Sequence, residues 1–360
     1  MKKRGPNPAC PTPSRRTETV KTLLSSVALA TFALSAGAAS AADKTLTISV
    51  YAFAQDEFKE IVYDPFKEIC GCDIVVETGN SVERLAKMEA NKASPVIAMA
   101  VMSMADALQA SRQDLIDDID FSKLTNYDKL YDIAKDPNKD GKSVGYTFYA
   151  TSIAYRPDKV TIESWADLLK PELAGRVAFP NVTTNQGPPA LYMLGKALGD
   201  DGADLTTPID AVAEHRDDFV TFYVRSSQLT QLMQQEEIWA APIGRFAWAG
   251  FTDMGFPVEW ATPKEGQTGG LNVMVLTKGS ENQELAMQFM DFWLSTDVQT
   301  KLAEALVDSP ANKDVVVSDE VANNLTYGAE TADSLSLIPS DVMLDKRDAW
   351  LEQWNEKVGQ

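Results

Sequence analysis

Residues 145–181, GYTFYATSIAYRPDKVTIESWADLLKPELAGRVAFPN, decide the fold of this chain. The stretch opens with an aromatic, apolar strand over residues 146–155 and continues into a short amphipathic helix over 165–169. Ser164 is in position to cap that helix, and a new strand follows over 176–179. Because one α/β unit ends here and a second begins, we interpret the stretch as the crossover between two lobes.

Upstream of this crossover, strands and helices alternate. Strands are predicted over residues 46–51, 73–77 and 95–102, with a helix after each. This order predicts a parallel sheet with right-handed crossovers. Ligands of such sheets lie beyond the carboxyl ends of the strands, which places Phe53 and Ser103 at one edge of a cleft.

Downstream, the alternation continues and then turns back. Helices are predicted over residues 190–198, 208–215, 228–235 and 246–254, and strands over 219–223, 239–243 and 258–260. A strand over 271–276 returns to the first lobe. We therefore predict an α/β fold of two lobes with a hinge and a central ligand cleft. Lobe 1 would hold residues 42–152 and 272–315, and lobe 2 would hold 153–271 and 316–360.

The first 41 residues have the features of a secretory leader. Basic residues precede an apolar run over 23–34, and Ala39-Ser40-Ala41 supplies the small-x-small pattern of a signal-peptidase site. The apolar run is shorter than the ~20 residues needed to span a bilayer. We therefore predict cleavage before Ala42, which would place the mature protein in the periplasm.

The chain is acidic, with a formal net charge of −19. The predicted leader carries six basic residues and one acidic residue, so the mature chain would carry −24. This charge argues against a nucleic-acid partner, because phosphate neutralisation requires clustered lysine and arginine. Two interpretations of the acidity stay open, affinity for a cationic solute and plain solubility.

The two cysteines of the predicted mature chain lie close together in the segment ICGC. Cys70 and Cys72 flank a single glycine, which is compatible with a local disulfide or with two buried thiols. A zinc site would need four ligands, and His215 is the only histidine in the sequence. A structural role is therefore favoured.

No catalytic motif stands out in the sequence. A two-histidine metal motif is impossible with one histidine, and neither a GxSxG elbow nor a P-loop occurs. The acidic pairs at 117–118 and 217–218 lie in polar turns typical of solvated surface. We expect a protein that is not an enzyme and that needs no metal or cofactor.

Several segments in this order resemble a known family. They are TISVYAFAQDEF, LTNYDKL, SWADLLKPELAGRVAFP, ATPKEG and MQFMDFWLSTDVQTKLAE, with SPANKDV after them. Together they are similar to the extracellular solute-binding proteins of ABC importers, and most of all to the spermidine/putrescine-binding class. The resemblance covers nearly the whole predicted mature chain. It implies a periplasmic-binding-protein fold that closes on a small solute and delivers it to an inner-membrane permease.

The resemblance also implies site residues. In that class, aromatic rings sandwich the methylenes of a polyamine and carboxylates hold its ammonium ends. Tyr51 and Phe53 match the first aromatic pair, and Tyr149 at the crossover could supply another ring. The key aspartate of that class comes a few residues after the PKEG turn, where this chain has Gly269, Gly270, Leu271 and Asn272, with no carboxylate and no tryptophan. The acidic residues expected after the first strand of the second lobe are likewise replaced, by Asn181 and Asn185.

One addition points to a different ligand. Arg245 follows a predicted strand and opens a helix, where a guanidinium can bind a carboxylate in bidentate fashion. Arg225 is a second candidate, and either arginine could instead pair with a neighbouring acid. We therefore expect a zwitterionic ω-amino acid such as γ-aminobutyrate, with Trp248 joining Phe53 and Tyr149 around its methylenes and ammonium.

Two alternatives to this ligand assignment are kept. The first is putrescine or spermidine, which needs a carboxylate in the cleft that Asp56 or Asp106 would supply. The second, more distant, is a secreted enzyme on a two-lobed scaffold. In each binding-protein interpretation the partners are the solute and a membrane permease, and the protein is expected to be a monomer.

Overall fold

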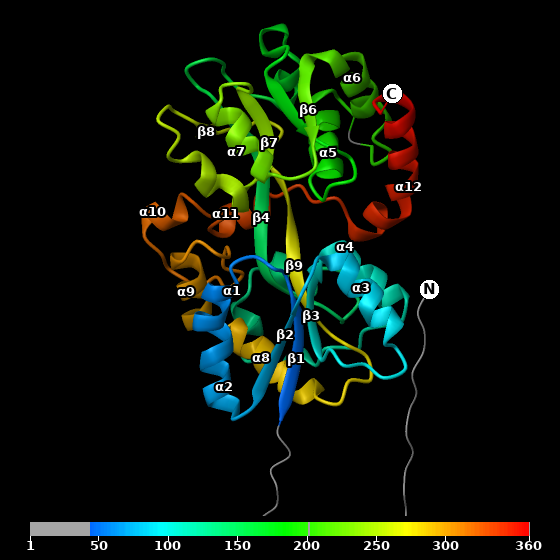
Figure 1. The fold of residues 1–360 in the computed structure, drawn as a ribbon, viewed down its shortest axis with the longest axis vertical. Coiled ribbons are helices and arrows are strands. Elements are labelled where there is room, and N and C mark those ends of the chain that lie inside the picture. The colour runs from blue at the N-terminus through cyan, green and yellow to red at the C-terminus, as the bar shows by residue number, and fades with distance from the viewer. Residues whose placement is uncertain (1–43, 201, 360) are drawn as a thin grey trace, which may run out of the picture. The chain divides into compact units, whose positions relative to one another are not determined.

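Two long antiparallel strands run through the middle of the fold, as the computed structural model of the protein shows in Figure 1. The structure describes residues 44–200 and 202–359, so the predicted leader and its cleavage site lie outside the described residues. The two strands, β4 (Val144–Tyr155) and β9 (Thr268–Leu276), belong to a sheet of nine strands. Its order is β2-β1-β3-β9-β4-β7-β5-β6, and β8 pairs with β4.

The predicted parallel βαβαβ arrangement at the start of the described chain is confirmed. The strand β1 (Thr45–Val50) pairs in parallel with both β2 (Asp73–Thr78) and β3 (Met99–Ser103). The connecting helices are α1 (Gln55–Phe58), a π-helix over Lys59–Tyr63, α2 (Asp64–Cys70) and α3 (Ser81–Ala90), and α4 (Met104–Arg112) follows β3. Their order positions the carboxyl ends of β1 and β3 at the same edge of the sheet.

Pro65 does not break the helix that contains it. The sequence predicts a kink or a split there, and a split is excluded because α1, the π-helix and α2 follow one another without a gap. Pro65 occupies the second residue of α2, directly after the π-helix. A proline lacks the N–H of a helical bond and its ring crowds the carbonyl four residues earlier, and a wider π turn relieves this conflict.

The second group of strands is mainly parallel. The strand β5 (Val177–Pro180) lies between β6 (Phe219–Tyr223) and β7 (Ala240–Gly244), parallel to both, and β8 (Glu259–Trp260) pairs antiparallel with β4. The helices of this region are α5 (Gly187–Ala197), α6 (Thr206–Glu214) and α7 (Ser227–Gln234). The helix predicted over 246–254 is a 3₁₀-helix over Arg245–Phe251.

The last part of the described chain is helical. Its helices are α8 (Gln283–Trp293), α9 (Thr296–Glu304), α10 (Asp319–Ala322), α11 (Ala329–Ser334) and α12 (Ser340–Lys357). Short 3₁₀ turns connect other elements at Phe121–Lys123, Tyr127–Lys129, Asp132–Ala134, Trp165–Leu169, Pro171–Leu173 and Arg216–Asp218. The predicted cap is present at Trp165–Leu169, where the Ser164 side chain accepts from the amide of Ala166.

The hydrophobic core is divided, and we name the lobes by it. Lobe 1 surrounds a core that contains Trp293 and Phe148, and lobe 2 surrounds two cores that contain Trp165 and Trp248. The side chains of β4 change from the first core to the others between Phe148 and Ile153. Near the end of the chain, Ala332 still packs in the lobe 1 core. The predicted lobe limits, with changes after 152, 271 and 315, stay a prediction.

The cysteine pair forms a local disulfide. Cys70 and Cys72 are bonded across Gly71, with their Cα atoms 5.2 Å apart. Gly71 has φ of 58°, which favours glycine, and it ends α2 in the left-handed conformation. Of the two structural alternatives that the sequence left open, this is the disulfide.

Among the described residues, no helix has the length and apolarity needed to cross a bilayer.

A substitution at Gly145 can test how closely the start of β4 packs against Ala134. A Cβ on Gly145 would lie 2.9 Å from both the Cα and the Cβ of Ala134. We expect Gly145→Ala to lower the free energy of unfolding by about 1–3 kcal/mol, because backbone atoms must shift to admit the methyl group. Chemical denaturation of the purified protein measures the effect.

The matched control is Gly79→Ala, which reduces the entropy of the unfolded chain in the same way. A Cβ on Gly79 would meet only the Glu83 side chain, with its carboxylate oxygen at 3.1 Å. Equal effects of the two exchanges would contradict the close packing of β4 against Ala134.

Candidate ligand site

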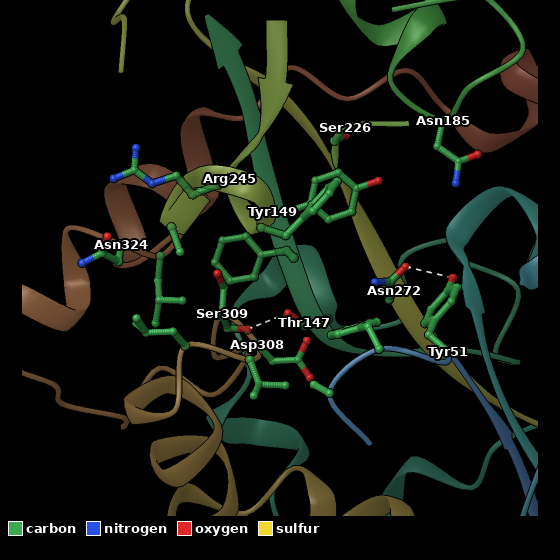
Figure 2. A pocket seen from close by; sticks show the side chains of 18 of the residues that line it. Tyr51, Thr147, Tyr149, Asn185, Ser226, Arg245, Asn272, Asp308, Ser309 and Asn324 are labelled. Atoms are coloured by element: carbon green, nitrogen blue, oxygen red, sulfur yellow. Dashed lines mark hydrogen bonds between the residues drawn. The ribbon is translucent and has the colours of Figure 1, made fainter. Parts of the chain in front are cut away.

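A cavity of about 650 Å³ opens where β4 and β9 pass from one lobe to the other. Its lining combines residues of both lobes. Figure 2 shows Tyr51, Tyr149 and Asn272 around this space, while the Arg245 side chain extends away from them. The rings come from Tyr51, Phe53, Phe148, Tyr149, Tyr223 and Phe246, the amides from Asn185, Gln186, Asn272 and Asn324, and the charges from Glu57, Arg245 and Asp308. A space of this size holds a small organic solute, and its rings and polar groups suit a ligand that is part hydrocarbon and part polar.

Six of the predicted site residues line this cavity. They are Tyr51, Phe53, Tyr149, Asn185, Arg245 and Asn272. They come from the ends of β1 and β7, from the middle of β4 and β9, and from the turn before α5. The sequence therefore brings together segments far apart in the chain.

Three other predicted residues do not line it. Ser103 caps α4 by accepting from the Asp106 amide at 3.1 Å, and its side chain belongs to a smaller neighbouring cavity. Arg225 is exposed beyond β6. Trp248 is buried in a lobe 2 core, stacked on Phe251. Its ring also meets that of Trp260 edge to face, with ring centres 5.6 Å apart, so Trp248 contacts Arg245 from the core side.

The predicted carboxylates of the polyamine alternative are also elsewhere. Asp106 accepts from the Ser103 hydroxyl at 2.8 Å and lines the smaller cavity, and Asp56 lines neither cavity. The residue Thr184, which precedes α5, serves the helix end, since its hydroxyl accepts from the Gly187 amide at 3.0 Å. Asn185 remains directed to the ligand space in Figure 2.

The Tyr51 ring packs against the buried guanidinium of Arg84. The Arg84 guanidinium lies 4.6 Å from the centre of the Tyr51 ring. Arg84 is fixed by bonds to the Ser49 hydroxyl at 3.0 Å and to the Gly79 carbonyl at 2.9 Å. Tyr51 in turn donates to the Asn272 amide oxygen at 3.2 Å. Burial raises the pKa of Tyr51 to about 12, so the ring stays neutral and its hydroxyl keeps its proton.

Tyr149 lies flat against β9 because two glycines leave room for it. A Cβ on Gly270 would lie 2.5 Å from the Tyr149 hydroxyl oxygen, and one on Gly269 would lie 2.1 Å from the Tyr149 carbonyl oxygen. Phe246 meets the Tyr149 ring edge to face, with ring centres 5.2 Å apart. These glycines occupy the place where the sequence lacks the expected acid and tryptophan, and they create an aromatic wall instead.

Arg245 is held by aromatic rings and by a carbonyl. Its guanidinium lies 5.0 Å from the ring centre of Trp248 and 4.5 Å from that of Trp260, and it donates to the Asn323 carbonyl. Burial lowers its pKa to about 10, which leaves it protonated at neutral pH. Its Nε is buried without a hydrogen-bond partner among the described residues. The predicted pairing of Arg245 with a ligand carboxylate stays a prediction.

Asp308 is the residue that sequence reasoning missed. Asp308 lines the cavity while it is only 5% exposed, and its Oδ2 is buried and has no hydrogen-bond partner among the described residues. Burial raises the pKa of Asp308 to about 7, and the Thr147 hydroxyl acts in the opposite direction. Such a carboxylate gains strongly from a cation placed beside it.

The segment that carries Asp308 is fixed by side-chain hydrogen bonds. Thr147 donates to the Ser309 carbonyl at 2.9 Å, and the Ser309 hydroxyl accepts from the Thr326 amide at 2.9 Å. Gln299, which is buried in α9, accepts from the Ala311 amide at 2.8 Å and donates to the Tyr146 carbonyl at 3.1 Å. The Asp308 carboxylate is therefore placed by a network that spans β4 and α9.

Comparisons with known proteins show the family of the chain. A family model described as bacterial extracellular solute-binding protein matches residues 62–329. The chain belongs to this family. Its members are not enzymes, and the protein is accordingly the solute-binding component of an ABC transporter, of the extracellular or periplasmic type.

Named relatives support the same assignment. The spermidine/putrescine-binding periplasmic protein of Escherichia coli (strain K12) is 27% identical over 284 residues, which cover 73% of this chain and 78% of the relative. A putrescine/cadaverine-binding protein of Pseudomonas aeruginosa is 26% identical over 276 residues, 71% of this chain and 77% of the relative.

Solved structures match the fold as predicted. An ABC transporter structure from Clostridium perfringens superposes with a TM-score of 0.80 at 31% identity, covering 87% of this chain and 99% of that chain. The Atu4243 GABA receptor superposes with a TM-score of 0.71 at 21% identity, covering 86% and 96%. The predicted periplasmic-binding-protein fold is confirmed.

The raised pKa of Asp308 makes stability depend on pH. Between the ordinary pKa of 3.8 and about 7, the folded protein holds a proton that the unfolded chain releases. The stability from this group is therefore complete below pH 3.8 and is lost as the pH rises to about 7. We expect Asp308→Asn, which resembles the protonated acid in shape, to gain on the wild type by on the order of 2–4 kcal/mol between pH 4 and pH 8.

Denaturant unfolding of the ligand-free protein at several pH values measures this difference. Asp348→Asn is the control, because it removes the same charge from an exposed position on α12. A constant difference between Asp308→Asn and the wild type over this range would refute the raised pKa.

Proposed function

We propose that this protein captures a small solute bearing a protonated amine, in the cavity between its lobes. The observation that carries this proposal is Asp308, a buried carboxylate in the cavity wall whose Oδ2 lacks a partner. A buried carboxylate is costly until a cation neutralises it, so an ammonium ligand supplies what the site lacks. The amine would lie against Asp308, within reach of the Thr147 and Ser309 segment that positions it.

The aromatic lining suits the hydrocarbon part of such a solute. Tyr51, Phe53 and Tyr149 face the same space, and the exposed fraction of Phe53, 47%, leaves its ring available for contact. Methylene groups pack on these rings, and an ammonium is attracted to their faces. Each neutral tyrosine contributes this surface without a competing charge.

A polyamine such as putrescine is the ligand that we favour. The curated relatives named above are binding proteins for putrescine, spermidine or cadaverine. Asp308 provides a carboxylate for one ammonium, at a position different from the one that the resemblance led us to inspect. The net charge of −19 favours the approach of a cationic solute at low ionic strength.

A zwitterionic ω-amino acid such as γ-aminobutyrate is the second candidate. Arg245 favours it, because a guanidinium in the cavity wall with an unpartnered Nε would attract a carboxylate. Against it, the faces of Trp248 and Trp260 and the Asn323 carbonyl already occupy the guanidinium. The GABA receptor named above supports only the fold at its level of identity.

The cellular setting belongs to the same proposal. The predicted leader would direct the chain to the periplasm, where the protein would act as a monomer. The loaded protein would deliver its solute to an inner-membrane ABC permease, the partner that the family implies.

Removal of the buried charge should abolish tight amine binding. We expect Asp308→Asn to weaken putrescine binding by about 100-fold or more, because a charge-assisted bond to a buried carboxylate is lost. Isothermal titration calorimetry measures the affinity, and the control is Asp348→Asn on the surface of α12.

The pH dependence of binding gives an independent check. An ammonium beside Asp308 favours its ionised form, so binding at pH 6 releases a proton and binding at pH 8.5 does not. Calorimetry in two buffers of different ionisation enthalpy detects that proton. If the wild type and Asp308→Asn release the same number of protons at pH 6, Asp308 does not hold the amine.

Substitution of Arg245 distinguishes the two ligand candidates. If the solute is a polyamine, Arg245→Gln should leave putrescine affinity unchanged or raise it up to about tenfold, because a like charge is removed. If the solute is γ-aminobutyrate, the same exchange should weaken its binding by about tenfold or more. The matched control is Arg225→Gln, which removes the same charge outside the cavity. Tight binding of γ-aminobutyrate without putrescine binding would reject the polyamine assignment.

A further inference from the structure

The last helix of the described chain, α12, belongs to lobe 2 and reaches across to lobe 1. Trp350 and Trp354 of α12 pack in a lobe 2 core, and the Trp350 indole donates to the Ala203 carbonyl at 3.0 Å. Ala107 and Ala110 of α4 pack in the lobe 1 core. Figure 1 shows the first turns of α12 beside α4, and the two helices are in contact. A change in the angle between the lobes therefore acts on this contact.

One ion pair joins the two helices. The Arg112 guanidinium, in the last turn of α4, donates to Asp345 Oδ1 of α12 at 2.7 Å. The two side chains are 40% and 62% exposed, so water and salt screen their attraction. Among the described residues, neither side chain forms another ion pair. A pair of this strength adds little to the stability of the fold, but it shifts an equilibrium between two lobe arrangements of similar free energy.

The smaller cavity, of about 120 Å³, lies at the same contact. Met343 and Leu344 of α12 line it from lobe 2, and Val82 lines it from lobe 1. Arg347 of α12 and Asp106 of α4 also line it, so charges of opposite sign on the two lobes face one space. The contact therefore combines apolar side chains with complementary charges, and both favour the approach of the lobes.

This contact is next to the ligand cavity. Thr184 and Asn185 of lobe 2 line both cavities. The ligand cavity needs walls from both lobes, with Asp308 on the lobe 1 side and Asn185 on the lobe 2 side. The lobe arrangement that pairs Arg112 with Asp345 is thus the one in which both walls face the solute.

We infer that Arg112 and Asp345 form a latch that holds the lobes in the binding arrangement, so that α12 adjusts the affinity for the solute without lining the ligand cavity. The part of this inference that concerns affinity rests on the proposed capture of an amine. The apparent affinity of a two-state protein falls in proportion to the fraction of molecules in the binding arrangement. Loss of the latch lowers this fraction, so it weakens every solute by the same factor.

Charge reversal tests the latch by replacing attraction with repulsion. Arg112→Glu and Asp345→Arg each bring like charges together, and the double exchange restores an opposite pair. We expect each single exchange to weaken putrescine and n-butylamine by the same factor, about three- to tenfold. The double exchange should return both affinities to within about twofold of the wild type. Calorimetry at low ionic strength measures them, because surface charges are least screened there.

The matched control is an ion pair that α12 forms inside its own lobe. Lys357 of α12 pairs with Asp210 of α6. Asp210→Lys also brings like charges together at α12, so it should lower thermal stability and leave the affinity for putrescine unchanged. Small-angle scattering of the ligand-free protein gives a second measurement. The radius of gyration should rise in Arg112→Glu, return in the double exchange, and stay at the wild-type value in Asp210→Lys.

The outcomes distinguish this inference from the proposed function. Scattering of the ligand-free protein needs no solute, so it still tests the latch if no amine binds the wild type and the proposed function fails. If the single exchanges raise the affinity, the pair holds the lobes apart and the inference is wrong. The inference is also wrong if they change neither the affinity nor the radius of gyration, or if the double exchange restores neither.

Discussion

The pairing of β4 with β9 is the constraint on which the rest of this protein depends. Their ladder runs from Val144 opposite Met274 to Thr151 opposite Thr268, and β4 carries side chains of the lobe 1 core at one end and of the lobe 2 cores at the other. The cavity lies along this ladder, so Tyr149 and Asn272 are placed by backbone hydrogen bonds. Residues of the loops that follow β1 and β7 lie next to this ladder in the cavity wall. The paired strands therefore hold the site in place.

The cavity combines one buried carboxylate with several neutral amides and rings. Asp308 supplies a full charge, while Asn272, Asn185 and Gln186 supply polarity without charge. A site of this kind gains selectivity from hydrogen-bond direction, because an amide has a donor side and an acceptor side. Arg245 adds a positive charge that Trp248 and Trp260 hold to one side. The electrostatic character of the site is therefore decided by orientation as much as by composition.

The sequence predicts the frame well and the site in part, for physical reasons. A local signal such as the cap at Ser164 acts within a few residues, so it is predicted from the sequence and present in the structure. Asp308 was not predictable in this way, because it follows α9 in a short loop, and the next residue is held by a hydrogen bond from Thr147, which is far away in the sequence. Trp248 packs in a lobe 2 core beside Trp260, a contact across the sequence that no local pattern in the chain predicts.

The glycines of β9 have a consequence for how such a cavity can diverge. At position 270 any side chain collides with the Tyr149 ring, so exchange there alters the shape of the cavity. At position 272, Asn272 accepts from Tyr51 through an oxygen that an aspartate would also possess. Exchange of asparagine for aspartate at that position alters charge and keeps shape. Substitutions at positions 270 and 272 of β9 can therefore change the shape and the charge of the cavity independently of each other, and with them the size and the charge of the solute that it binds.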